Sequence, residues 1–332
     1  MDPDQKPNMV PTMNPQGPPD NLHKDIPGNP STAKTSKTRL NDRSNGQPLR
    51  VLNETEWEFW TYHGYVVVKN AITRDQAKKT ADFIWEFEEK NPVDPESWYT
   101  KPRAEMQMKE LVGSGMVEVY NHQLLWNNRQ MPRVYNAFVD IWGTEKLWVT
   151  IDRANLNFPL RPGDPFKGFI HWDYDPETKP QNVQGVLALA DQLDENMGGF
   201  QCIPELFRTY DTWKTTQPED RNRFQPDIRG MEDKIVKVRL EAGDLLIFHS
   251  AQPHGIRPNR SQNKVRIAQY ISMMPAEEDN EALRQWRITS WIDRIAPQGY
   301  AFPGDPRAWE QTRYKTAALN ELGKKLLGLE KW

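Results

Sequence analysis

The sequence has a single cysteine, Cys202, among its 332 residues. This scarcity excludes an internal disulfide, and it excludes a metal site built from several cysteines. No apolar run approaches the roughly 18 residues that a bilayer-spanning helix needs. The first residues, MDPDQKPNMVPTMNP, also lack the apolar core of a secretory signal. We therefore expect a cytoplasmic protein without membrane insertion, in which Cys202 is a small core residue.

Excess charge of either sign is also missing. The 43 basic and 46 acidic residues leave a net charge of only −3. A field on this scale does not recruit nucleic acid or an anionic membrane, so neither is expected as a partner. A small-molecule substrate remains as the expected partner, and the sequence leaves the oligomeric state open.

The N-terminal segment has no Phe, Trp or Tyr, and the first such residue of the chain is Trp57. The first thirty positions hold eight prolines, and most of the others are polar. Such a segment buries too little apolar surface to offset the entropy lost on ordering. We expect residues 1–48 to form a disordered tail, with an extended arm laid over the domain as the alternative.

The remaining residues predict one domain, 49–332, of mainly β structure with flanking helices. Residues 49–146 form a mostly helical N-terminal part that includes a lid. Residues 147–275 hold several short alternating stretches separated by turn signals, which is typical of an all-β barrel or sandwich. A helical insertion is expected at 204–224, and residues 276–332 read as helices.

A candidate metal site lies in the stretch GFIHWDYDPETK, which places His171 and Asp173 two positions apart. Side chains at i and i+2 of a strand point to the same side, so this pair can hold one ion. Iron(II) oxygenases often use two histidines and one carboxylate, which leaves three positions open for other ligands. By position in the chain, His122, His249 and His254 remain as candidates for the third ligand.

An oxo-acid cosubstrate needs a cation for its far carboxylate, and a guanidinium fork suits that task. Arg266 follows His254 by twelve residues and lies in the strand-like run KVRIAQY. Arg257 and Arg260 are closer to His254 and lie in loop-like sequence, so neither is expected to be this anchor.

These segments together resemble the phytanoyl-CoA dioxygenase-like family. The resemblance rests on H-W-D, on NMGGFQCIPELF, on GDLLIFHSAQPHGIRPNRS followed by VRIAQY, and on the opening LNETEWEFWTYHGYVVVKNAIT. It covers about residues 50–275. His171 and Asp173 match the paired ligands of the family, His254 matches its distal histidine, and Arg266 matches its cosubstrate arginine. His249 matches a preceding histidine that is not a ligand.

The resemblance implies a double-stranded β-helix, a jelly-roll related to cupins. It also implies a dioxygenase that uses Fe(II), 2-oxoglutarate and O2 to oxidise a C–H bond. The expected result is hydroxylation, with oxidative dealkylation where the carbon bears nitrogen or oxygen. The expected substrate is a small polar metabolite, amino-acid-like or of natural-product type. Two alternatives stay open: a non-enzymatic metal-containing β-barrel that binds ligands, and a zinc-dependent cupin-type lyase or hydrolase.

Residues around the predicted ligands supply further candidates. Asn155 and Asn157 share a strand face with Arg153, and either asparagine could hydrogen-bond the cosubstrate carboxylate. We expect substrate contacts from Arg153 and from three other residues: His122 in the covering region, and Trp172 and Tyr174 beside the ligands. The alternative for Trp172 and Tyr174 is packing beneath the helical insertion.

Overall fold

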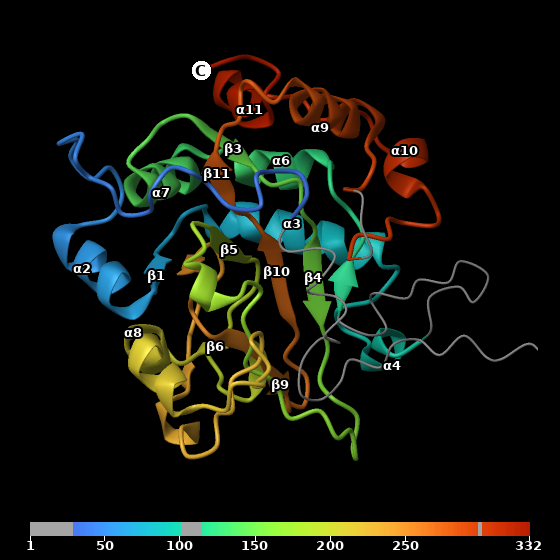
Figure 1. The fold of residues 1–332 in the computed structure, drawn as a ribbon. Helices are drawn as coiled ribbons and strands as arrows, with labels where there is room; N and C mark the ends of the chain where they lie inside the picture. The colour runs from blue at the N-terminus through green and yellow to red at the C-terminus, as the bar shows by residue number, and fades with distance from the viewer. Residues whose placement is uncertain (1–28, 101–114, 298–300) are drawn as a thin grey trace, which may run out of the picture.

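The computed structural model describes residues 29–100, 115–297 and 301–332. Its centre is an antiparallel six-stranded sheet (Figure 1). The strands lie in the order β1 (Tyr65–Val68), β8 (Leu245–His249), β5 (Val183–Ala188), β10 (Arg266–Tyr270), β4 (Ala154–Asn157) and β2 (Met116–Val117). A second antiparallel sheet has three strands in the order β7 (Val236–Lys237), β6 (Met197–Cys202) and β9 (His254–Asn259). A short pair joins β3 (Leu147–Val149) to β11 (Met273–Pro275).

The two larger sheets share one apolar cluster. Val186, Phe248 and Ala268 come from the six-stranded sheet, and Phe200 and Cys202 come from the three-stranded sheet. Strand residues of one face thus pack against each other across the space between the sheets, as in any two-layer β structure. The expected place of Cys202 in the core is confirmed, because its side chain is fully buried.

Helices surround the strands, as the sequence predicts. Most of them lie above the sheet in the view of Figure 1, and α8 lies beside the three-stranded sheet. They are α2 (Glu54–His63), α3 (Arg74–Phe87), α4 (Pro95–Trp98), α6 (Gln123–Arg129), α7 (Pro132–Trp142), α8 (Pro204–Trp213), α9 (Glu281–Asp293), α10 (Trp309–Arg313) and α11 (Glu321–Leu327). Helix α8 begins the predicted insertion. The expected lid includes residues 101–114, which lie outside the described residues.

The start of the domain follows its local signals. Asn53 accepts a hydrogen bond from the backbone N–H of Glu56, and the Glu56 side chain accepts one from the N–H of Asn53. This reciprocal pair is a capping box and fixes the first turn of α2. The helix ends at Gly64, whose φ of +73° lies in the left-handed region that glycine adopts without a steric penalty. Strand β1 then begins at the next residue.

The expectation of a disordered tail as far as residue 48 is wrong for residues 29–48, and residues 1–28 lie outside the described part. The Asn29 side chain donates to the backbone carbonyl of Ile151 and to the carboxylate of Asp152. Leu40 is buried, and its N–H donates to the side chain of Gln181. The segment is therefore the extended arm of the alternative interpretation, held by polar contacts that composition does not reveal.

Arg287 of α9 joins this arm to the C-terminal part. Its guanidinium is fully buried and donates to four backbone carbonyls, which belong to Ser31 in the arm, Val149 in β3, and Leu326 and Leu327 in α11. Burying a cation is unfavourable unless hydrogen bonds replace its hydration. The arm, β3, α9 and α11 thus meet around one side chain, because each carbonyl contributes to that replacement.

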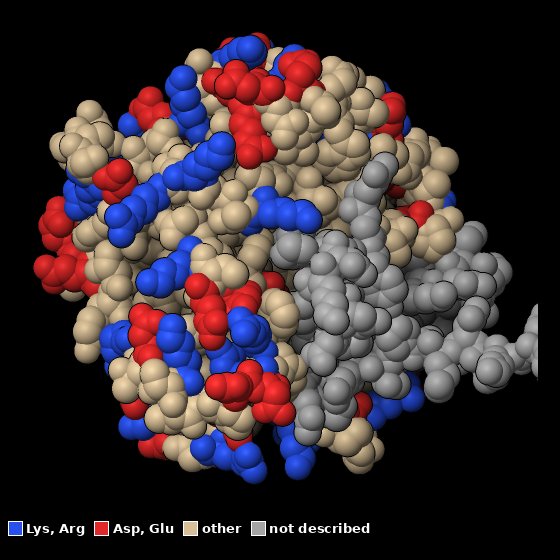
Figure 2. All heavy atoms as spheres, viewed as in Figure 1, with Lys and Arg blue, Asp and Glu red and all other residues tan. Residues whose placement is uncertain are grey.

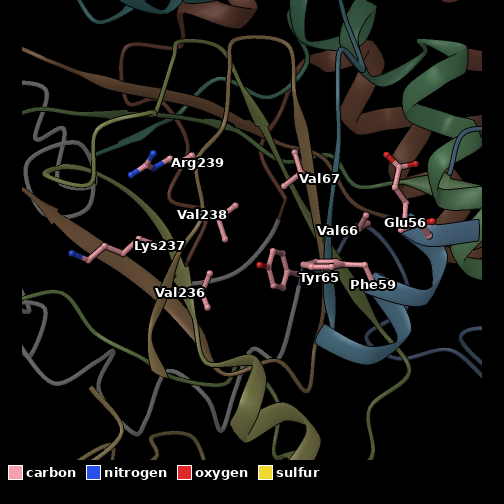
Figure 3. A pocket seen from close by; sticks show the side chains of 10 residues that line it. Glu56, Phe59, Tyr65, Val66, Val67, Val236, Lys237, Val238 and Arg239 are labelled. Atoms are coloured by element: carbon pink, nitrogen blue, oxygen red, sulfur yellow. The ribbon is translucent and has the colours of Figure 1, made fainter. Parts of the chain in front are cut away.

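On the face shown in Figure 2, basic and acidic side chains are interspersed. A groove of about 400 Å³ lies where α2 and the edge strand β1 approach β7. Figure 3 shows Phe59, Tyr65 and Val236 among its lining side chains. No helix of the described residues is long and apolar enough to cross a bilayer.

Candidate metal centre

The segment before β5 brings His171 to His254, the first residue of β9. The two residues form an antiparallel bridge, with N–H···O distances of 2.7 Å from His171 to His254 and 2.9 Å in reverse. Gly255 permits this approach, since a β-carbon there would lie 1.9 Å from the carbonyl oxygen of Phe169. Backbone pairing therefore fixes the spacing of the two imidazoles.

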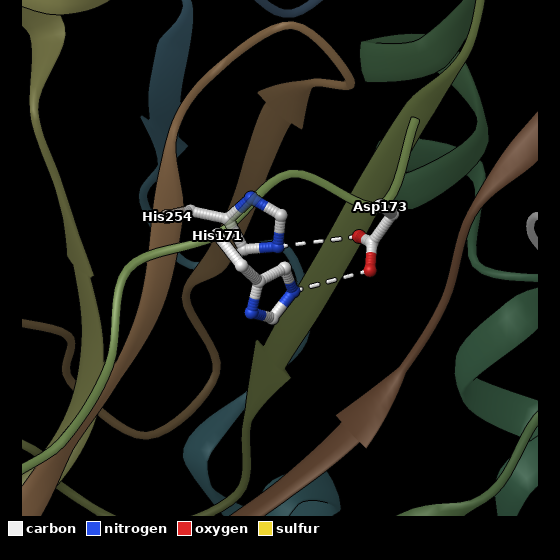
Figure 4. Close-up of side chains that lie close together, drawn as sticks. All are labelled: His171, Asp173 and His254. Atoms are coloured by element: carbon white, nitrogen blue, oxygen red, sulfur yellow. Dashed lines mark hydrogen bonds and ion pairs between the residues drawn. The ribbon is translucent and has the colours of Figure 1, made fainter. Parts of the chain in front are cut away.

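Asp173 completes the cluster. The Nε2 atom of His171 lies 3.2 Å from Oδ1 of Asp173, and Nε2 of His254 lies 3.3 Å from Oδ2 (Figure 4). One candidate ligand atom from each residue lies within 4.8 Å of those of the other two. Within the described ranges, this is the one group of three or more His, Cys, Asp or Glu residues that could hold a metal ion. The three predicted ligands are thus brought together.

Neighbouring groups orient the three side chains. Nδ1 of His254 lies 2.9 Å from the backbone carbonyl of Gln252, so Nδ1 carries a proton and donates to that carbonyl, while Nε2 faces Asp173. The side-chain amide of Gln184, on β5, donates to Oδ2 of Asp173. Phe169 stacks on the ring of His171 at a centroid distance of 4.9 Å. These contacts preset the directions of the ligand atoms.

The electrostatics favour an ionised carboxylate. Burial alone would raise the pKa of Asp173, but the charges and hydrogen bonds of His171 and His254 outweigh it and hold that pKa well below the usual value. His171 and His254 are themselves 9% and 7% exposed. A negative carboxylate between two mostly buried imidazoles is a suitable donor set for a divalent cation.

Arg266 is the first residue of β10, in the six-stranded sheet. It pairs in register with Asn157, and Ala268 pairs with Asn155, so the four side chains share one face of the β4–β10 pair. Arg266 is 1% exposed, and its Nη1 donates to Oδ1 of Asn155 at 2.5 Å. A buried guanidinium held by a neutral amide keeps its full positive charge available for an anion.

Arg153 is placed differently from the expected substrate contact. Its Nη1 donates to Oε1 of Glu118 at 2.6 Å in a buried ion pair, and its guanidinium lies over the ring of Phe302. The pairing strands explain this contact, since β2 runs alongside β4 and leads directly to Glu118. The charge of Arg153 is therefore largely compensated within the protein.

The remaining predicted substrate residues do not join the cluster. Trp172 is fully buried against Tyr210 and Trp213 of the insertion, because strand alternation turns it away from His171 and Asp173. The expectation that Trp172 lines the mouth is therefore wrong, and the alternative of packing beneath the insertion is confirmed.

Tyr174 and His122 also have structural contacts. Tyr174 is buried, and its hydroxyl accepts a hydrogen bond from Asn182 at 2.7 Å. His122 caps α6, stacks on Phe83 of α3 at 3.7 Å and meets the edge of Tyr314. Burial lowers the pKa of His122 to about 4. The described contacts of both residues lie within the scaffold and not at the metal cluster.

His249 is the histidine that the resemblance sets aside. It ends β8, and its Nδ1 accepts a hydrogen bond from the N–H of Ala251 at 2.9 Å. Burial lowers its pKa to about 4, so the ring is neutral at pH 7. Sequence reasoning missed Gln184 and Gln252. The alternation of NVQGVLALAD could have placed Gln184 on the inner face, whereas a backbone carbonyl such as that of Gln252 leaves no signal in residue type.

A family model described as phytanoyl-CoA dioxygenase matches residues 60–268, more than half of the chain. The chain belongs to the phytanoyl-CoA dioxygenase family. All three candidate ligands and Arg266 lie inside the matched region. Family membership supports an oxidoreductase of the dioxygenase kind.

Two curated relatives of this phytanoyl-CoA dioxygenase family member share about a quarter of their aligned residues with it. Ava biosynthesis cluster protein O of Aspergillus versicolor is 24% identical over 233 residues, covering 64% of this chain and 74% of the relative. A putative phytanoyl-CoA dioxygenase of Dictyostelium discoideum is 23% identical over 321 residues, covering 82% and 86%.

Solved structures show the fold beyond the family-matched region. GlcNAc Inducible Gene 2 of Candida albicans aligns with a TM-score of 0.60 at 14% identity, covering 94% of this chain and 82% of that one. A hypothetical protein of Escherichia coli aligns with a TM-score of 0.60 at 18% identity, covering 86% and 87%. At these identities the likeness concerns the fold alone.

Proposed function

We propose that this protein is a non-haem Fe(II)- and 2-oxoglutarate-dependent dioxygenase that oxidises a C–H bond of a small polar metabolite. One observation carries the proposal: His171, Asp173 and His254 converge from two chain segments with their ligand atoms within 4.8 Å of one another. A third histidine of the same region, His249, is bound to a backbone N–H instead.

The donor set fits the metal that the family implies. Two imidazoles and one carboxylate are the ligands of a facial triad, which leaves open positions for a cosubstrate and dioxygen. Iron in such a site, when bound with 2-oxoglutarate, would supply the oxidising chemistry. Gln252 and Gln184 fix His254 and Asp173, so little reorganisation accompanies metal binding.

The other residues of the chain would bind and orient. Arg266 would hold the far carboxylate of 2-oxoglutarate by charge-assisted hydrogen bonds, and Asn155 would keep the guanidinium in place. Asn157 shares this face and would add a polar contact. Phe169, Phe200 and Phe248 pack on the imidazoles and would keep water from the ligand atoms.

The two antiparallel sheets would form the double-stranded β-helix of one oxygenase domain, residues 49–332. The polar substrate would enter from the side of the metal cluster, and its recognition would not depend on Trp172. The name of the Aspergillus versicolor relative refers to a biosynthesis cluster, which supports a metabolite of natural-product or amino-acid type. The proposed outcome is hydroxylation, followed by oxidative dealkylation where the carbon bears nitrogen or oxygen.

The test is anaerobic loading with Fe(II) and 2-oxoglutarate, followed by oxygen and a panel of polar metabolites. We expect one class of metabolite to stimulate succinate release. His171→Ala and Arg266→Ala should abolish this release, while Arg260→Ala, which alters an exposed arginine, should not. Full activity in His171→Ala would reject the proposal. Turnover with zinc in the absence of 2-oxoglutarate and oxygen would instead indicate a lyase or hydrolase.

A further inference from the structure

A second buried arginine lies close to Arg266. Arg257 is 1% exposed and belongs to β9, although its sequence reads as a loop. Burial and, after it, the charge of Arg266 lower the pKa of Arg257 to about 10, so Arg257 is a cation at pH 7. Arg266 is equally buried, and its charge acts on Arg257.

Their hydrogen bonds are incomplete within the described part of the chain. Nη1 of Arg257 donates to the carbonyls of Phe200 at 2.8 Å and Val238 at 3.1 Å, and its Nε and Nη2 have no partner there. Arg266 donates through Nη1 to Asn155, and its Nε has no partner among the same residues. Buried donors of a charged group that lack an acceptor are costly, so an acceptor is expected.

Carboxylates of the described residues do not fill this role. Asp194 and Glu195 act on Arg257 from a distance, and Arg239 opposes them. Asp194 is itself paired with Lys264 at 2.8 Å, and Glu195 with Arg239 at 3.0 Å. Two cations thus share a buried region in which the nearby acids already have other partners, and an anion from outside would stabilise both.

The glycines of β6 make room beside these groups. A β-carbon on Gly199 would lie 3.1 Å from Nη2 of Arg257, and one on Gly198 would lie 3.0 Å from Oδ1 of Asn157. Asn157 is the cross-strand partner of Arg266. Both glycines also have a positive φ, +76° at Gly198 and +107° at Gly199, which other residues rarely adopt. Gly199 thus lies beside Arg257, and Gly198 lies beside the strand partner of Arg266.

We propose that Arg257 acts with Arg266 as a second cationic donor to the far carboxylate of the 2-oxo-acid cosubstrate. This inference rests on the proposed function and extends it to cosubstrate selection. Two guanidinium groups can satisfy both oxygens of one carboxylate, so the site should strongly prefer dicarboxylic over monocarboxylic 2-oxo acids. Arg257 is a binding residue in this scheme and takes no part in the oxidation.

The experiment measures binding without turnover. The full chain is loaded with Mn(II) under nitrogen and titrated calorimetrically with 2-oxoglutarate and with 2-oxobutanoate, which lacks the far carboxylate. Arg257→Met should weaken 2-oxoglutarate binding by about 10- to 100-fold and change 2-oxobutanoate binding by less than about threefold. Arg260→Met, the same change at an exposed arginine nearby, should leave both affinities within about threefold.

An equal loss for both ligands, or no loss for 2-oxoglutarate, would overturn the inference. If Arg257→Met does not fold, Arg266→Met decides: a residual preference for 2-oxoglutarate of about fivefold or more supports the second cation, and equal binding overturns it. Wild-type protein that binds Mn(II) and both acids equally overturns this inference while leaving the metal site intact. Wild-type protein that binds neither acid rejects the proposed function itself.

Discussion

Two histidines five residues apart provide the sharpest test of the metal centre. His254 directs Nε2 toward Asp173 at 3.3 Å, whereas His249 uses Nδ1 to accept the N–H of Ala251 at 2.9 Å. Replacing each by alanine removes the same ring from two strands that are consecutive in the chain, β8 and β9, and the contacts of the two rings assign the two losses to different properties. Metal affinity should fall in the first variant, and stability in the second.

The magnitudes follow from these contacts. Loss of a partner that only orients a ligand lowers metal affinity by about 10- to 100-fold. His254→Ala removes one of the proposed ligands itself, so metal affinity should fall by more than about 100-fold. His249→Ala leaves a backbone N–H without its acceptor and should lower the free energy of unfolding by about 1–3 kcal/mol. Its metal affinity should stay within about threefold of wild type.

Competition with a chromophoric chelator for Mn(II) measures the affinity, and urea unfolding of the metal-free protein measures the stability. Measuring both properties guards against a general folding defect, because His249→Ala is expected to be the less stable variant and yet to bind metal better than His254→Ala. Wild-type affinity in His254→Ala would refute the assignment. So would a larger loss of affinity in His249→Ala than in His254→Ala.

Three further predictions concern single contacts. Gly255→Ala should lower metal affinity and unfolding free energy together, since its β-carbon would meet the Phe169 carbonyl at 1.9 Å; calorimetry that detects no change contradicts this. Gln184→Ala should weaken Mn(II) binding by about 10- to 100-fold through a misoriented Asp173, and an unchanged affinity would exclude that role. Burial raises the pKa of Glu88 from 4.5 to about 8, so the folded state binds an extra proton in this interval and wild-type stability falls as pH rises through it. Glu88→Gln should remove up to about 1.4 kcal/mol of this decline per pH unit, as measured by urea unfolding between pH 5 and 8.

The strand-like stretches, and the pairing of His171 with Asp173 as candidate metal ligands, could be predicted from the sequence because each depends on short-range patterns. The i, i+2 rule places His171 with Asp173, and turn residues mark the ends of the strands. The choice of His254 over His249 needed the family resemblance. Both histidines lie at strand ends, and the backbone N–H that occupies His249 has no signature in side-chain type.

Other expectations failed where tertiary contacts outweigh local composition. Residues 29–48 are poor in apolar side chains, yet Asn29 and Leu40 hold them through polar partners more than a hundred residues away. Arg153 looked available for a ligand on its strand face, but Glu118, the residue after β2, pairs with it. Arg257 read as a loop residue because Pro258 and Asn259 follow it, although both belong to β9.

The buried side chain of Arg287 has a consequence for how small the enzyme can be made. Family matching covers residues 60–268, so a chain trimmed to that range would lack this arginine and both terminal segments that it fastens. Val149 in β3 would then lose its hydrogen bond from Arg287. The strand β4, which carries Asn155, would lose this support a few residues upstream. We therefore expect the shortest chain that folds by itself to be longer than the region matched by the family model and to include both terminal segments, which Arg287 joins to each other.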